Sequence, residues 1–274
     1  MNNKLKKSIL FLFLSTLTFL FSGCASSPAA SGISESEINA EAAKAYAEVK
    51  SKSKISQNPE YNAMVQRVAD RIAAVTGEKF AWEYVVIESP EVNAWCMPGG
   101  KIAVYTGLFP VVKTEGALAA VLGHEVSHAT LRHGMQGYAR AKQNNYIGGA
   151  VAVGSALLGQ FFCKTDTCKL IAAGGGAAAG FALTYFDRKF SRVDETAADQ
   201  NGQLFMARAG YDPSEAIKLW ERMSASQKGG APPEFISTHP SDANRRNNLT
   251  AWLPTAEAEY AKAPQKYGTG EVIK

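Results

Sequence analysis

The sequence has little cysteine, little excess of either charge and no internal repeat. Only four Cys occur in 274 residues, and none lies in the paired CxxC spacing of a structural zinc site. Three Lys stand in the first seven residues, so 26 basic residues face 25 acids over the rest of the chain. A nearly neutral body gives little support for nucleic-acid binding. Without a repeat, an appended helical array is not expected.

The chain does contain enough apolar sequence for a domain of catalytic size. Apolar residues make up 46% of it and charged residues 20%, with 24 Gly and 11 Pro. This composition excludes collagen, a coiled coil and wholesale disorder. The length allows one well-buried domain or two small ones.

Residues 1–23 are typical of a lipoprotein signal peptide. A basic start precedes an apolar run over residues 9–21, which is too short for a comfortable bilayer span. The box Phe21-Ser22-Gly23-Cys24 resembles a bacterial lipoprotein cleavage site, in which Cys24 becomes the lipidated first residue. Residues 24–34 would then be the lipidated Cys and a flexible tether. The alternative is an uncleaved signal anchor.

Lipidation at Cys24 would fix the protein firmly to a membrane, because several acyl chains hold far better than one. Among Gram-negative lipoproteins, the lack of Asp at position 25 indicates sorting to the outer membrane, facing the periplasm. Export would also place the other cysteines in an oxidising compartment. Cys163 and Cys168 enclose a polar turn, so a disulfide between them is predicted, with two free thiols as the alternative.

Hydrophobic periodicity predicts one domain over residues 35–253 that is made of helices and a small sheet. Helical spacing or capping residues predict helices over residues 35–50, 59–77, 114–128 and beyond, 191–209, and after Asp212. Period-two alternation predicts a strand over 80–87, and a hairpin is predicted from strands 92–97 and 101–105 around a Pro-Gly-Gly turn.

Two segments stand apart in composition. Residues 146–186 are strongly apolar and rich in Gly and Ala. Small residues let two helices approach closely, which favours a packed apolar helical hairpin over membrane insertion. Residues 254–274 are predicted to be a polar C-terminal tail, punctuated by Pro254 and Pro264.

The segment His124-Glu125-Val126-Ser127-His128 lies inside a predicted helix. Residues four apart share a helix face, so both imidazoles can bind one zinc ion while Glu125 addresses a water on that metal. The alternative is an incidental pair of surface histidines. The spacing favours zinc, because this pattern rarely arises by chance.

A third protein ligand is needed, because a catalytic zinc keeps one position open. His133 is nearest, but at nine residues from His124 it is expected on the opposite helix face, as a surface or second-helix contact. Glu195 and Asp199 are four apart on a downstream helix. Glu195 can therefore bind zinc while Asp199 accepts a hydrogen bond from a ligating imidazole. Spacing alone leaves Asp194 as a competing ligand, and a solvated acidic face as the plain alternative.

The chain resembles the HtpX-like and CAAX-prenyl-protease-like zinc metallopeptidases of peptidase family M48, particularly the small outer-membrane lipoprotein proteases of the LoiP type. The resemblance runs from about Pro59 to about Arg246. Besides the zinc motif, it rests on ordered segments at residues 93–94, 98–100, 104–108, 198–199, 209–213 and 237–240, and on Arg245.

The resemblance implies an α+β fold, a mainly helical gluzincin domain with a small sheet. The strand that carries Gly99, Gly100, Ile102 and Val104 would be an edge strand that faces the active-site cleft and pairs with extended substrate. One zinc ion per chain is implied, with Glu125 as a catalytic residue.

The resemblance also implies that His239 is catalytic, either as a donor to the developing oxyanion or as a switchable extra ligand. The alternative for His239 is a cap on the loop before Pro240. For Arg245, the alternatives are an ion pair with an acid near the site and an ordinary surface position.

The implied activity is that of a zinc-dependent endopeptidase that cleaves misfolded or damaged cell-envelope proteins. The implied partners are unfolded or misassembled envelope proteins, the membrane through the lipid anchor, and complexes with other envelope proteases or with the outer-membrane protein assembly machinery. The rival hypothesis is a periplasmic chaperone or assembly factor for outer-membrane proteins with latent protease activity. No long extension is expected after Arg246, which favours the enzyme.

Overall fold

The computed structural model describes residues 34–135, 190–226, 235, 239 and 244–273. The described part is mainly helical with one small sheet, which confirms the predicted fold class. The predicted signal peptide, the lipidation site Cys24, the apolar hairpin at 146–186 and the Cys163–Cys168 pair lie outside the described residues. Among the described helices, none combines the length and apolar character needed to cross a membrane.

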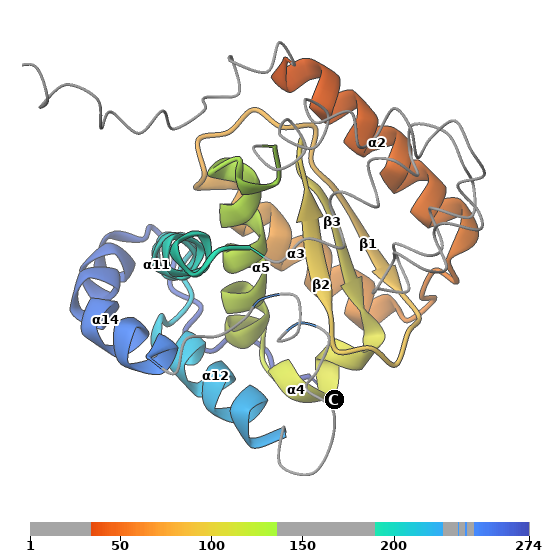
Figure 1. The fold of residues 1–274 in the computed structure, drawn as a ribbon. Coiled ribbons are helices and arrows are strands. Elements are labelled where there is room, and N and C mark those ends of the chain that lie inside the picture. Colours follow the sequence, from red (N-terminus) through yellow and green to blue (C-terminus); the bar gives the residue numbers. More distant parts are fainter. Residues whose placement is uncertain (1–33, 136–189, 227–234, 236–238, 240–243, 274) are drawn as a thin grey trace, which may run out of the picture.

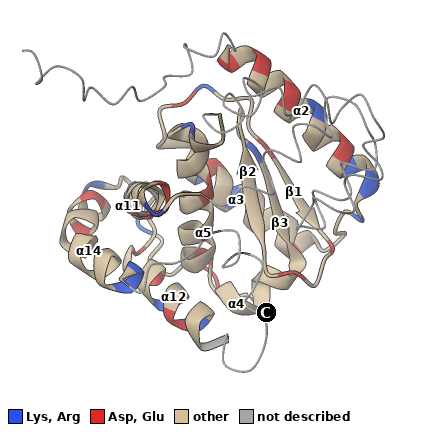
Figure 2. Ribbon diagram, viewed as in Figure 1, with Lys and Arg blue, Asp and Glu red and all other residues tan. Residues whose placement is uncertain are grey.

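Two helices precede the sheet, close to their predicted bounds. Helix α2 (Glu35–Lys52) begins at a capping box formed by Ser34 and Glu37. Figure 2 shows acids in its first turn and lysines in its last, which complement the helix dipole. Helix α3 (Pro59–Ala74) begins after Asn58, whose side chain accepts hydrogen bonds from two backbone amides. The apolar face predicted for α3 is buried at Met64, Val65, Val68 and Ile72.

The sheet contains β1 (Glu83–Ile87), β2 (Ala94–Met97) and β3 (Lys101–Tyr105) in the order β1-β3-β2. Strands β2 and β3 form the predicted antiparallel hairpin. Gly99 and Gly100 occupy its turn with φ of 76° and 79°, a backbone conformation that glycine adopts without steric cost. Strand β1 begins three residues later than predicted and pairs parallel with β3.

The predicted edge strand is wrong. Ile102 and Val104 lie in β3, the central strand, which is hydrogen-bonded on both sides, and Gly99 and Gly100 lie in the turn. Alternation along a hairpin shows that both strands are extended but carries no information on which of them accepts a third strand. The edge strand beside the later helices is β2 (Figure 1).

Helices α5 (Glu115–Thr130) and α11 (Arg192–Arg208) carry the predicted ligands and pack against each other (Figure 1). A 3₁₀ turn, η2 (Thr106–Leu108), and α4 (Phe109–Val112) lead from the sheet into α5. Thr114 caps α5 as predicted, and Ser191 forms a capping box with Asp194 at the start of α11. Both helices therefore begin where the sequence predicts.

Glycines bring the two backbones into contact beside the first zinc-motif histidine. A Cβ atom on Gly202 would lie 2.7 Å from the backbone nitrogen of His124, and one on Gly123 would lie 2.6 Å from the carbonyl oxygen of Gly202. These distances leave no room for a methyl group on either helix. The approach of α5 to α11 therefore requires glycine at both positions.

Helices α12 (Ser214–Ser226) and α14 (Arg245–Lys262) lie beyond α5 from the sheet, together with α11, whereas α2 lies across the sheet's other side (Figure 1). The side chain of Asp212 accepts a hydrogen bond from the amide of Ser214 at the start of α12, as the sequence predicts.

Residues 254–273 of the predicted polar C-terminal tail include the end of α14 and a segment that contacts α5. Helix α14 continues through Pro254, because a proline removes only one helical hydrogen bond and packing can compensate for it. The following residues return to the start of α5, where the carbonyls of Glu271 and Thr269 accept from the amides of Glu115 and Gly116. The first amides of a helix have no partner within it, so this segment completes α5.

The close approach of the two backbones predicts that Gly→Ala at position 202 is destabilising, although Gly→Ala stabilises most helices. Gly to Ala inside a helix ordinarily stabilises by about 0.5–1 kcal/mol. We expect Gly202→Ala instead to lower the free energy of unfolding by about 1–3 kcal/mol, because the methyl group forces α5 and α11 apart. Gln200→Ala, on the exposed side of the same helix, is the control. Urea unfolding tests this, and an unchanged or higher midpoint for Gly202→Ala would contradict it.

Candidate metal centre

Four ligand-type side chains converge on one point between α5 and α11. His124, His128, Glu195 and His239 are all buried, and each offers a donor atom within 4.8 Å of the other three. The Nε2 atoms of His124 and His128 are 3.1 Å apart. Zinc–nitrogen bonds of about 2.0–2.1 Å place neighbouring tetrahedral ligands about 3.3 Å apart. The spacing therefore fits ligands around a single ion.

Glu195 faces both imidazoles, as predicted for the third ligand. Its Oε2 lies 3.4 Å from His124 Nε2, and its Oε1 lies 3.5 Å from His128 Nε2. Within the described part of the chain, Glu195 Oε2 is buried without a hydrogen-bond partner. A buried carboxylate oxygen of this kind is costly unless something satisfies it. Two imidazoles and one carboxylate are a ligand set of zinc peptidases, so these residues fit zinc.

Asp199 holds His124 from outside the cluster, as predicted. Its Oδ1 lies 2.9 Å from His124 Nδ1, so the ring donates its Nδ1 proton and turns an unprotonated Nε2 towards Glu195. The Arg245 guanidinium contacts the same carboxylate and lies 3.4 Å from Glu195 Oε2. Of the two alternatives for Arg245, the ion pair near the site is correct, because the side chain is buried over the Trp220 ring.

The surroundings of Glu125 and Glu195 shift their pKa values in opposite directions. Burial raises the pKa of Glu125 to about 7, even though His239 favours its ionised form. Burial also opposes ionisation of Glu195, yet His239 and His124 hold its pKa well below the usual range. Glu195 is therefore a permanent carboxylate, while Glu125 is balanced between its two forms near neutral pH. That difference suits one as a ligand and the other as a proton acceptor.

The imidazoles also differ in their protonation. Burial and the neighbouring His124 and His239 lower the pKa of His128 well below its ordinary value. For His124, burial and Arg245 oppose protonation, but Asp199 and Glu195 outweigh them and raise its pKa. A neutral imidazole is the form that binds a metal, so metal binding at this centre competes with protonation of His124.

His239 lies inside the cluster. Its Nδ1 is 3.0 Å from Glu195 Oε1 and 3.2 Å from His124 Nε2, and its Nε2 is 3.3 Å from Glu125 Oε1. The ring stacks on Phe235, with centroids 4.9 Å apart. These contacts place His239 in the group of side chains that could hold a metal ion, and also beside Glu125.

Strand β2 reaches the centre at Glu125. The backbone of Cys96, in the middle of β2, hydrogen-bonds to the Glu125 carboxylate. The other oxygen, Oε1, has no hydrogen-bond partner among the described residues. The free edge of the sheet and the Glu125 carboxylate therefore lie side by side, whereas the sequence analysis expected β3 to be that edge.

Asp194 is excluded as a ligand. Its Oδ2 accepts a hydrogen bond from the Ser191 amide in the capping box, and its Oδ1 lies 3.6 Å from His133 Nε2. One step along the helix turns a side chain by about 100°, so Glu195 enters the centre while Asp194 faces away from it.

His133 makes the second-helix contact that the sequence analysis allowed, with its Nε2 3.6 Å from Asp194 Oδ1 on α11, and it does not lie at the surface. Helix α5 ends at Thr130, and Arg132 has a left-handed φ of 58° that reverses the chain. His133 is consequently buried against His128, with the two Nδ1 atoms 3.0 Å apart. Only the expected opposite helix face is incorrect, because α5 stops at Thr130 and residue spacing shows no signal of that end.

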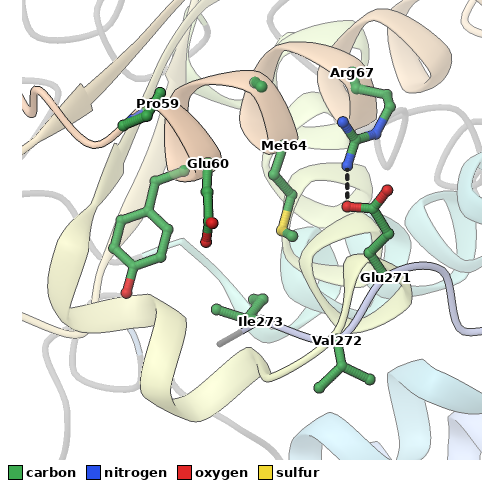
Figure 3. Close-up of a pocket in the computed structure, with 9 residues that line it drawn as sticks. Pro59, Glu60, Met64, Arg67, Glu271, Val272 and Ile273 are labelled. Atoms are coloured by element: carbon green, nitrogen blue, oxygen red, sulfur yellow. Dashed lines mark hydrogen bonds and ion pairs between the residues drawn. The ribbon is translucent and has the colours of Figure 1, made fainter.

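A separate pocket of about 390 Å³ lies between the start of α3 and the C-terminal segment (Figure 3). Arg67 and Glu271 form an ion pair of 3.0 Å at its edge. None of the nine residues that line it belongs to the metal centre. The chemistry of the described residues is therefore concentrated between α5 and α11.

Paired histidines one helical turn apart, an intervening glutamate and a glutamate from a second helix define a site of the zinc metallopeptidase class. Residues 56–253 match the family described as peptidase family M48. The chain belongs to that family.

Several relatives share most of the described region. The chain is 36% identical over 221 residues to mitochondrial metalloendopeptidase OMA1 of Schizosaccharomyces pombe, covering 78% of this chain and 60% of that protein. It is 31% identical over 196 residues to OMA1 of Saccharomyces cerevisiae, covering 66% and 50%. It is also 27% identical over 198 residues to the β-barrel assembly-enhancing protease of Yersinia pestis, covering 69% and 39%. The chain thus spans about half the length of these relatives.

The ligand assignment predicts loss of metal on removal of one carboxylate. We expect Glu195→Ala to lower zinc affinity by more than about 100-fold, because loss of an outer-shell partner alone costs about 10–100-fold. Glu221→Ala, at an exposed position on α12, should bind zinc like the wild type. Competition with a chromogenic chelator measures both affinities. Equal affinities for wild type and Glu195→Ala would refute the assignment.

Proposed function

We propose that the protein is a zinc-dependent endopeptidase. The observation that carries the proposal is the convergence of His124, His128 and Glu195 beside Glu125, in a chain of a peptidase family. When bound there, zinc supplies Lewis-acid polarisation of a water and of the scissile carbonyl. The residues of the chain supply the rest of the chemistry.

Glu125 is proposed as the group that moves protons. With a pKa raised by burial to about 7, its carboxylate can take a proton from water and return it to the leaving amine. The Cys96 backbone holds this carboxylate in place from β2. The other carboxylate oxygen, Oε1, has no hydrogen-bond partner among the described residues and lies 3.3 Å from His239 Nε2.

Substrate is proposed to bind as an extended segment along β2. A strand edge binds peptide through backbone hydrogen bonds, so it is tolerant of sequence and requires the substrate to be unfolded locally. His239 would act as a switchable ligand, since it lies between Glu125 and the other ligands where a reacting water must enter. Displacement of His239 would then open the site to substrate.

We further propose that the enzyme is an outer-membrane lipoprotein that faces the periplasm, in the manner of the LoiP type. The basic and apolar leader and the box ending in Cys24 support this proposal. Its substrates would be misfolded or damaged envelope proteins. Other envelope proteases and the outer-membrane protein assembly machinery are the partners proposed for it.

A chaperone or assembly factor is the second candidate. The names of the Yersinia pestis relative and of a 28% identical Escherichia coli relative, β-barrel assembly-enhancing protease, favour this alternative. A chaperone needs only to bind unfolded chains, whereas a peptidase needs the proton acceptor. A substitution of Glu125 should therefore abolish a peptidase function and leave a chaperone function intact.

Substitution of Glu125 distinguishes the candidates. For an endopeptidase, Glu125→Gln should lower the rate of cleavage of unfolded casein by about 10²–10⁴-fold, the usual contribution of a general base, while zinc affinity stays near that of the wild type. Glu257→Gln, at an exposed position on α14, is the matched control and should keep full activity. Full cleavage by Glu125→Gln would rule out the proposed proton transfer. Loss of cleavage together with undiminished suppression of aggregation would show an additional chaperone function.

The lipid anchor is tested independently of catalysis. In a Gram-negative host, Cys24→Ser should remove incorporation of labelled fatty acid, because the thiol is the acylation site. Cys96→Ser is the control, since Cys96 is buried in β2. A wild-type protein without label would contradict the anchor and leave the zinc site unaffected.

A further inference from the structure

The Nδ1 atoms of the two zinc-motif imidazoles, His124 and His128, contact different groups. His124 meets the carboxylate of Asp199, the usual kind of partner for a ligating histidine. His128 instead meets another histidine, His133, with the Nδ1 atoms 3.0 Å apart. His133 is only 8% exposed, and Phe190 packs against the His128 ring with centroids 3.9 Å apart. The second ligand is therefore fixed by a buried His–His contact.

The backbone directs His133 into this contact. Arg132, with φ of 58°, adopts a left-handed conformation that is unfavourable for a residue with a side chain. Its guanidinium bonds to Glu78 and to Glu35, at 3.0 and 3.1 Å. These ion pairs come from two other segments of the chain and stabilise the reversal that follows α5. The position of His133 is thus imposed by tertiary contacts.

Two facing Nδ1 atoms can form a hydrogen bond only if one of them carries a proton. A proton on His133 Nδ1 would leave His128 protonated on Nε2, which points into the metal centre and could not then bind a metal. A proton on His128 Nδ1 leaves its Nε2 lone pair free, 3.1 Å from His124 Nε2. Only the second arrangement is compatible with a ligand.

Asp194 favours the compatible arrangement. Its Oδ1 lies 3.6 Å from His133 Nε2, so the negative charge attracts the proton of neutral His133 to Nε2 and leaves Nδ1 as an acceptor. Asp194 is held in turn by the capping box at Ser191. The acid that is excluded from the metal centre thus acts on it through two imidazoles.

We propose that His133 is a positioning residue that holds His128 in the tautomer and orientation that bind zinc, and that Asp194 fixes the tautomer of His133. The proposal rests on the zinc site of the proposed function. It assigns a role to a histidine that lies outside the group of side chains that could hold the metal ion.

The test compares two isosteric replacements in the full chain. Asn places a carbonyl oxygen where His133 has Nδ1, whereas Leu has the same shape without an acceptor. We expect His133→Leu to lower zinc affinity by about 10–100-fold and His133→Asn to restore most of it. Chelator competition measures affinity without substrate. A merely structural position would favour Leu, which is the more apolar residue and the better helix former.

Apo-protein thermal unfolding establishes that both variants fold. If His133→Leu does not fold, Asp194→Asn replaces it in the test. This variant keeps the oxygen that caps α11 but removes the negative charge beside His133. It should lower zinc affinity, by less than the roughly 10–100-fold expected for His133→Leu. Equal zinc affinities for wild type, Leu and Asn variants, or equal losses in both, would overturn the proposal while the zinc site stands. A wild type that binds no zinc would overturn the proposed function as well.

Discussion

The contact between α5 and α11 is the constraint on which the metal centre depends. Gly123 and Gly202 let the two backbones meet beside His124, so the histidines of one helix face the glutamate of the other. Metal–ligand distances hold to within about 0.2 Å, so the position of α11 has to be accurate. Glycine achieves this because a backbone-to-backbone contact has no side chain that can change rotamer.

The two buried carboxylates at the centre are paired with Arg245 and with the His124 imidazole. Glu195 and Asp199 are buried beside a single guanidinium, that of Arg245, and Glu195 Oε2 has no hydrogen-bond partner among the described residues. Burying charged groups without full compensation is strongly unfavourable. A zinc ion bound there would pair with the Glu195 carboxylate in place of a protonated His124, so metal binding and the stability of the fold would be linked. Burial also raises the pKa of Glu125 to about 7.

Local features of the fold and site could be predicted because neighbours in sequence produce them. The starts of α2, α5 and α11 follow from capping residues within three positions, and the hairpin follows from a turn with two glycines. The errors all concern distant partners. Strand β1 pairs with β3 and makes it the central strand. The carbonyls near residue 270 accept hydrogen bonds from the first turn of α5. The ion pairs of Arg132 stabilise the turn that follows the end of α5.

By itself, the sequence determined the chemistry available to this protein: two imidazoles and a glutamate on one helix face, with an acid pair on a second helix. The helical repeat is enough to establish that, because it relates residues three or four apart. Only the tertiary structure decided that Glu195 enters the centre while Asp194 faces His133, and that β2 is the edge beside Glu125. Those choices depend on how helices and strands pack, and residue spacing along one chain does not encode the packing.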